Sequence, residues 1–216
     1  MNRYAKFGLP VLLLALAILL ASCGGGSAQS ADQDEDGKSG GMSGMKGMDH
    51  GSGGMASGML MKNGKYSDER FIDAMVPHHE GAVEMARVAL KNAEHPEIKQ
   101  LAENIISTQK AEIEELKSIK QEEFGTSKVP MDMSMGRMKD MGMMMNPEDL
   151  AKRDPFDRAF IENMIPHHQS AIEMAGVARK ETDNPKIKKL ATNIIEAQER
   201  EISQMKQWRE HWYPQS

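Results

Sequence analysis

Apolar residues recur every three or four positions in two stretches of the chain, 66–123 and 154–216, a spacing that places them on one face of an α-helix. A proline divides each stretch, at Pro96 and Pro185, and proline is favoured at the first position of a helix. Asn184 and Asp154 each precede a proline and are expected to cap the helix that follows. The pattern therefore predicts four helices, at about 67–93, 96–122, 155–182 and 185–211.

The two stretches are copies of one unit. Residues 71–117 align without a gap with residues 160–206, and 25 of the 47 aligned positions are identical. A single helical hairpin cannot bury its own apolar stripe, whereas two hairpins can bury their stripes against each other. We therefore predict an all-α fold: a ferritin-like four-helix bundle made of two duplicated αα-hairpins, 66–123 and 154–216.

The segments outside the two units are rich in methionine. Residues 24–65 are largely Gly, Ser, Asp, Lys and Met, a composition that buries too little apolar surface to offset chain entropy. We predict a flexible tether over 23–65 and a disordered Met-rich connection over 124–153. These segments hold 14 of the 20 methionines: Met42, Met45, Met48, Met55, Met59, Met61, Met131, Met133, Met135, Met138, Met141, Met143, Met144 and Met145.

The N-terminus has the form of a secretory signal. Two basic residues precede an apolar run over 11–21, which is too short for a comfortable membrane span of about 20 residues. The residues Leu20-Ala-Ser-Cys23 are similar to the bacterial lipobox, in which the cysteine is lipidated. We predict a signal peptide over 1–22 and a lipid anchor at Cys23, which places the protein in the bacterial cell envelope, facing the periplasm or the exterior. An ordinary signal peptide with an incidental cysteine is the alternative.

Charge and cysteine content exclude several classes of protein. The formal net charge is −5, which weighs against a nucleic-acid partner, because nucleic-acid binders need a basic face. A single cysteine excludes an internal disulfide framework, a zinc ribbon and an iron–sulfur cluster.

Glu-x-x-His, which a ferritin-like di-iron centre requires, does not occur, and His79-Glu80 lacks the second histidine of a zinc protease. We therefore predict no enzymatic activity.

The first helix of each unit carries candidate metal ligands on its apolar face, which should point into the bundle. Imidazole and thioether groups suit copper or silver ions. Pro77 and Pro166 stand inside these helices and are expected to kink them. The alternative is that the histidines are hydrogen-bonded core residues and the methionines only pack. The candidate ligands are Met75, His78, His79 and Met85, and Met164, His167, His168 and Met174.

The second helix of each unit places polar residues within or beside its apolar stripe, namely Gln109, Glu112, Gln198 and Glu201. Hydrogen bonds from these residues to the histidines would fix the imidazole tautomers. His95 stands where the other unit has Asn184, so we expect it to cap a helix and not to bind metal. Trp208, His211, Trp212 and Tyr213 gather at the C-terminus, and the tryptophans are expected to cover one end of the bundle.

The Met-rich segments are candidates for weaker metal sites. Thioethers carry no proton, so acid does not compete with a soft monovalent ion for them, whereas a histidine loses affinity towards pH ~6.5. Drift in a linker, or a store of oxidisable methionine, is the alternative. The candidate secondary ligands are Met42, Met45, Met48, His50, Met131, Met133, Met135, Met138, Met141, Met143, Met144 and Met145.

The motif Asp68-x-x-Phe-Ile-x-x-Met-x-Pro-His-His-x-x-Ala-x-x-Met-Ala86 and its copy over 157–175 resemble the bacterial family known as domain of unknown function 305, over about residues 66–213. The resemblance implies a ferritin-like bundle, often secreted. Some members are similar to CopM-type periplasmic copper-binding proteins, which implies that the two Met/His sets are copper ligands. The Met-rich segments go beyond the shared motif.

These features together favour an envelope lipoprotein that binds a copper ion, with Cu(I) favoured and Ag(I) or Cu(II) as further candidates. Its role would be sequestration, or delivery to a metal-export or chaperone partner in copper resistance. Two alternatives stay open: a non-catalytic scaffold or interaction lipoprotein with structural histidine pairs, and a ferritin-like redox enzyme.

Overall fold

The computed structural model describes residues 58–130 and 146–214 and confirms the predicted all-α bundle. Four long helices make up most of it: α2 (Asp68–Asn92), α3 (Pro96–Phe124), α6 (Phe156–Glu181) and α7 (Pro185–Trp212). A short helix, α5 (Pro147–Leu150), precedes α6, and a two-stranded hairpin of β1 (Met61–Lys62) and β2 (Lys65–Tyr66) precedes α2. None of the helices in the described ranges has the length and apolar character needed to cross a membrane.

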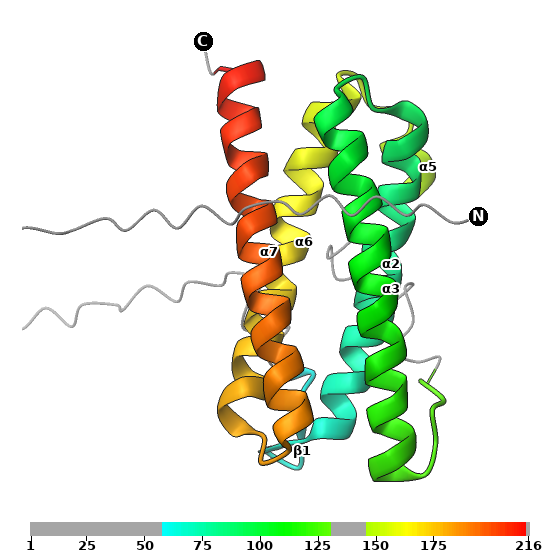
Figure 1. Cartoon of the computed structure of the whole chain (residues 1–216), viewed down its shortest axis with the longest axis vertical. Coiled ribbons are helices and arrows are strands. Elements are labelled where there is room, and N and C mark those ends of the chain that lie inside the picture. The colour runs from blue at the N-terminus through cyan, green and yellow to red at the C-terminus, as the bar shows by residue number, and fades with distance from the viewer. Residues whose placement is uncertain (1–57, 131–145, 215–216) are drawn as a thin grey trace, which may run out of the picture. The chain divides into compact units, whose positions relative to one another are not determined.

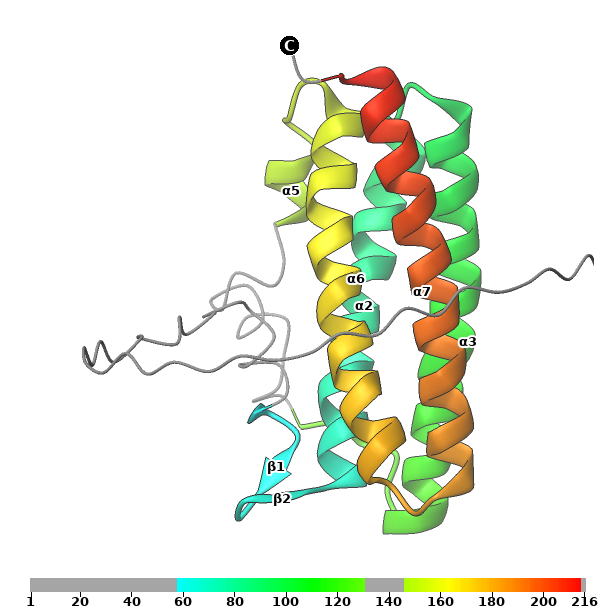
Figure 2. The same ribbon diagram turned by 90° about the vertical axis from the view of Figure 1, so that its left-hand side faces the viewer.

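The helices pack as two antiparallel hairpins, α2 with α3 and α6 with α7 (Figure 1). The two hairpins meet mainly through α2 and α6, and α3 lies beside α7 on the opposite side of the bundle (Figure 2). Each of the first helices, α2 and α6, thus contacts both its own partner and its counterpart in the other hairpin.

Of the three helix caps expected from the sequence, the one at Asn184 is formed and those at Asp154 and His95 are not. The side chains of Ser67 and Asn184 accept hydrogen bonds from backbone N–H groups in the first turns of α2 and α7. Asp154 does not cap α6, because Pro155 has an extended backbone and the helix begins one residue later than expected. His95 occupies the capping position of α3, but its side chain makes no capping hydrogen bond. Both α2 and α6 run unbroken through their inner prolines.

Residues outside the two predicted units also pack on the bundle. The hairpin turns at Asn63-Gly64, which both have positive φ, as a tight hairpin turn requires. Leu60, within the predicted tether, is fully buried in the core, and Met59 packs against the same cluster. Leu150, within the predicted connection, is also fully buried. Residues 58–65, which the sequence assigns to the tether, therefore include most of a β-hairpin that docks on the helices through buried Leu60 and turns at Asn63-Gly64.

The interior contains two apolar clusters. In one, the N-terminal half of α2 packs with the C-terminal halves of α3 and α6 and the N-terminal half of α7. In the other, the remaining halves of the four helices pack together with Leu150. Every helix passes from one cluster to the other at the level of its histidines or of its glutamine and glutamate. A buried polar layer therefore separates the two apolar clusters.

Candidate metal centre

The polar layer lies at the middle of the bundle and draws side chains from all four long helices. Its four histidines come from α2 and α6 and are between 0 and 2% exposed. The second helices contribute one buried glutamine each and one glutamate each. The layer consists of His78, His79, Gln109, Glu112, His167, His168, Ser170, Gln198 and Glu201.

His78 and His167 meet at the centre of the layer. Their ring centroids are 3.8 Å apart, at an interplanar angle of 37°. Each ring lies 6.3 Å from the ring of the next residue in sequence, His79 or His168. The duplicated histidine pairs thus form one cluster of four imidazoles.

The outer two histidines each contact a carboxylate. Nε2 of His168 lies 2.6 Å from Oε2 of Glu201, at hydrogen-bond geometry. Nε2 of His79 lies 2.9 Å from Oε2 of Glu112, an ion-pair contact without hydrogen-bond alignment. A carboxylate at Nε2 favours the tautomer that carries its proton there, which leaves Nδ1 with a free lone pair. The two glutamates lie where the sequence places them, and their role in tuning a metal site stays a prediction.

Ser170 fixes the tautomer of His78. Its hydroxyl donates to the backbone carbonyl of His167, 2.8 Å away, and lies 2.7 Å from Nε2 of His78. With the hydroxyl proton on the His167 carbonyl, the Ser170 oxygen accepts from Nε2–H of His78, and Nδ1 of His78 then keeps a lone pair. The counterpart of Ser170 in the first unit is Gly81, which offers no hydroxyl to His167. The layer is therefore asymmetric at its centre.

Many polar atoms of the layer have no hydrogen-bond partner among the described residues. They include Nδ1 of all four histidines, Nε2 of His167 and both amide atoms of Gln109 and Gln198. The expected hydrogen bonds from the two glutamines to the histidines are thus not formed. Buried polar atoms are normally paired, and a cluster of unpaired ones indicates a place for water or an ion.

The four candidate methionines lie on both sides of the layer, at most 1% exposed. Met75 and Met174 share one apolar cluster, and Met85 and Met164 share the other. Within residues 58–130 and 146–214, no group of three or more His, Cys, Asp or Glu side chains is arranged to hold a metal ion. The buried imidazoles of the layer and the buried thioethers in the clusters on either side of it are donors that suit Cu(I) and Ag(I) better than hard cations.

Burial depresses the basicity of the central pair. It lowers the pKa of His78 well below the usual 6.5, and His79 and His168 lower it further. Burial likewise lowers the pKa of His167, with His78 as the next largest cause. Both imidazoles are therefore neutral at pH 7, and protons do not compete for their lone pairs until the solution is well below pH 6.5.

These shifts make folding stability depend on pH. In the unfolded chain both histidines bind protons below about pH 6.5, whereas in the folded chain they stay neutral to lower pH. The unfolded state then holds more protons, so the metal-free protein loses stability as pH falls below 6.5, by up to about 1.4 kcal/mol per pH unit for each histidine. Urea denaturation between pH 7.5 and 5 measures the slope. In His78→Gln/His167→Gln the slope should be smaller, and parallel curves for the two proteins would contradict the assignment.

Two sets of contacts were not foreseen from the sequence, and several predicted residues lie outside the described ranges. Ser170 stands one turn after His167 on the same helical face, which is the signal that points to it. His95 hydrogen-bonds through Nδ1 to Asp157, at 2.6 Å, and stacks on Trp212, which stacks on Trp208 at the bundle end.

Residues 1–57 and 131–145 are outside the described ranges, and they include Cys23, Met42, Met45, Met48, His50, Met131, Met133, Met135, Met138, Met141, Met143, Met144 and Met145.

Comparison with known proteins places this bundle in a family. A family model described as domain of unknown function (DUF305) matches residues 19–120 and residues 68–209. The structure of CopM in the Cu(II)-bound form is similar, with a TM-score of 0.65 and 46% identity, covering 69% of this chain and 99% of that one. CopM in the Cu(I)-bound form has a TM-score of 0.61 and 44% identity over the same shares of both chains.

A shorter match links the chain to a viral protein. Uncharacterized protein L153 of Acanthamoeba polyphaga mimivirus is 45% identical over 49 residues, which is 23% of this chain and 32% of that protein. This chain therefore spans about a third of that relative. The DUF305 match over residues 68–209 includes α2, α3, α6, most of α7 and the whole polar layer, and it covers more than half of the sequence. The chain belongs to the DUF305 family.

Proposed function

We propose that this protein binds copper, chiefly as Cu(I), through the imidazoles of the polar layer and the methionines beside it. The observation that carries the proposal is the set of buried ring nitrogens without partners among the described residues. His78 is held with its Nδ1 lone pair free, and its pKa is low enough to keep it neutral. A neutral, oriented imidazole between buried thioethers is a ligand environment for a soft metal ion.

The likeness to CopM supports the same proposal. CopM has been solved in Cu(I)-bound and Cu(II)-bound forms, and this chain aligns with almost its whole length. Copper in this proposal is cargo that the protein binds and releases, and no reaction on a substrate is invoked. The protein would sequester the ion or deliver it to a metal-export or chaperone partner.

We further propose that the protein works in the bacterial envelope, anchored through a lipid on Cys23. The basic and apolar leader and the lipobox-like Leu-Ala-Ser-Cys support this placement. An anchored protein with many thioethers and no free thiol suits an oxidising compartment, where cysteine ligands would be lost to disulfides. The Met-rich segments would then act as weaker, faster collectors of the ion.

A competition titration tests the proposal. The purified chain is titrated with Cu(I) in the presence of a chromophoric chelator, beside a variant with His78, His79, His167 and His168 changed to Asn. We expect the wild type to take copper from the chelator and the variant to bind at least about 100-fold more weakly at its tightest site, because it loses ligands that pre-organised partners orient. The change His95→Asn with His211→Gln, outside the layer, is the matched control and should leave this affinity unchanged. Equal affinity in the wild type and the four-histidine variant would show that the layer is not the site.

A further inference from the structure

The polar layer is enclosed by four helices, so a metal ion must pass between side chains to reach it. A groove on the surface between α3 and α7 lies at the same level along the bundle. Much of its lining is small or uncharged and polar, namely Ser107, Thr108, Ala111, Asn193 and Ala197. Because these side chains are short, they leave a groove between the two helices at this level.

Glu112 connects this groove with the layer. Its side chain lines the groove, yet the residue is only 8% exposed and its Oε2 lies 2.9 Å from Nε2 of His79. Gln109, one turn earlier on α3, is 2% exposed, and neither of its amide atoms has a hydrogen-bond partner in the described part of the chain. The carboxylate thus lies at the floor of the groove, and unpaired polar atoms lie next to it in the layer.

The charge of the groove favours a cation. Glu112, Glu115 and Glu196 supply three carboxylates against the single guanidinium of Arg200. Clefts lined by one sign of charge raise the local concentration of the opposite ion and its rate of association.

A second groove, between α2 and α3, provides a contrast. It is lined by three acidic and three basic side chains, Glu80, Glu84, Glu114, Arg87, Lys110 and Lys117. Two ion pairs lie within it, Lys117 with Glu80 and Arg87 with Glu84. Its lining includes no residue of the polar layer. Of these two grooves, the one between α3 and α7 therefore has both an excess of negative charge and a lining residue that belongs to the polar layer.

We propose that the groove between α3 and α7 is the route by which a metal cation reaches the polar layer. Glu115 and Glu196 attract the hydrated ion, and Glu112 accepts it at the floor of the groove and passes it to His79. The step exchanges water and carboxylate oxygen for imidazole nitrogen and involves no change of oxidation state. This inference rests on the proposed function, since it assumes that the layer is where the ion is held.

The rate of Cu(II) loading tests the route. The parent protein is the full-length chain with His50→Gln, His95→Asn and His211→Gln, which leaves the four layer histidines as its only imidazoles out of seven. Copper(II) sulfate is mixed with it at low ionic strength, and freeze-quench EPR follows the appearance of imidazole-nitrogen coupling. In this parent, Glu115→Gln/Glu196→Gln should load about three- to tenfold more slowly with an unchanged equilibrium affinity, because it loses attraction and no ligand. The difference should shrink at high salt, where charges on the surface are screened.

Two further variants complete the design. Ala111→Phe/Ala197→Phe, which fills the groove without changing its charge, should also slow loading. Glu114→Gln/Glu199→Gln makes the same charge change on the same two helices, at exposed residues outside this groove, and should load at the parent's rate. The route is wrong if both groove variants load as fast as the parent, or if the control pair slows loading equally. A parent that acquires no imidazole-bound copper(II) would overturn the route, and a parent that also takes no Cu(I) from the chelator in the competition titration would overturn the proposed function as well.

Discussion

Replacing His78 and His167 with leucine is expected to stabilise the metal-free protein and, at the same time, to remove its tightest copper site. The two rings are fully or nearly fully buried, and three of their four ring nitrogens have no hydrogen-bond partner among the described residues. A buried polar atom left unpaired costs about 1–3 kcal/mol, and leucine fills a similar volume without such an atom. We expect the free energy of unfolding to rise by about 1–3 kcal/mol in His78→Leu/His167→Leu.

The measurement is urea denaturation of the metal-free protein at pH 7.5, repeated with Cu(I) added. Copper should stabilise the wild type in proportion to its affinity and should stabilise the leucine variant far less. The matched control is His79→Leu/His168→Leu, which also removes two imidazoles but deprives Glu112 and Glu201 of their partners. Because it leaves carboxylates unpaired, the control should be neutral or destabilising. A central variant that is less stable than the control would show that the layer is structural.

This contrast bears on the scaffold alternative, in which the histidine pairs are structural. A structural histidine contributes stability, whereas a histidine kept for a ligand is retained at a cost to stability. His168, hydrogen-bonded to Glu201, has the surroundings of a structural histidine. His167, with neither ring nitrogen paired to a described residue, does not. The two kinds of histidine stand next to each other, so the layer combines support with available ligands.

The sequence was sufficient for the fold and for the location of the layer. The repeat of Pro-His-His at 77–79 and 166–168 and the apolar stripes fix which helix faces turn inwards, because helical periodicity is local. The same periodicity places Glu112 and Glu201 beside the histidines. Periodicity does not show that these glutamates contact the histidines whereas Gln109 and Gln198 stay unpaired among the described residues. Which side chains reach the histidines depends on how closely the helices pack.

Features that depend on contacts distant in the sequence were not predictable. Leu60 lies in a stretch that the sequence assigns to a polar tether, and only the structure shows that its side chain is buried in the core. The hydroxyl of Ser170 reaches His78 across the interface of two hairpins, 92 positions away. Lys120 lies beside apolar Ile119 on a helix with many charged residues, and nothing local indicates that its ammonium group is buried.

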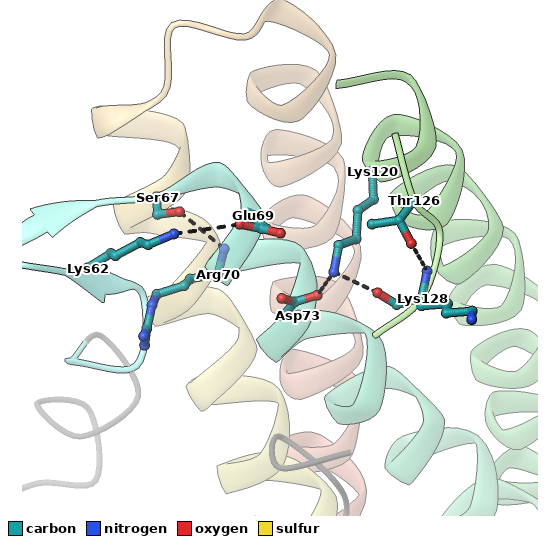
Figure 3. A network of polar contacts seen from close by, with 8 residues as sticks. All are labelled: Lys62, Ser67, Glu69, Arg70, Asp73, Lys120, Thr126 and Lys128. Carbon is teal, nitrogen blue, oxygen red and sulfur yellow. Dashed lines mark hydrogen bonds and ion pairs between the residues drawn. The ribbon is translucent and has the colours of Figure 1, made fainter. Parts of the chain in front are cut away.

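Lys120 contacts Asp73 and Lys128 at the end of the bundle where the hairpin of β1 and β2 lies (Figure 3). It is 1% exposed, forms an ion pair with Asp73 of α2, and donates to the backbone carbonyl of Lys128 at 2.7 Å. Asp73 is itself only 7% exposed. The ammonium group therefore connects α3 with α2 and with the segment that follows α3. Val129 of that segment packs against the nearby apolar cluster.

Lys120→Met is expected to be strongly destabilising, with a loss of about 3–5 kcal/mol in the free energy of unfolding, because it removes one partner of a buried ion pair. The repeat supplies the control. Arg209 and Glu162 stand at the positions of Lys120 and Asp73 in the second unit, but they line an open surface groove and Glu162 pairs with Arg158. Arg209→Met should therefore change stability by no more than about 0.5 kcal/mol.

A double mutant separates the charge from the packing. If the loss in Lys120→Met comes from the broken ion pair with Asp73, adding Asp73→Asn should recover most of it, because the amide keeps the shape of the side chain and removes the charge. If the loss comes from the contact with the Lys128 carbonyl, the second change should recover nothing and the two effects should add. Urea denaturation of the four proteins of the cycle measures the coupling. A Lys120→Met variant no less stable than Arg209→Met would show that this buried pair contributes nothing to holding α2 and α3 together.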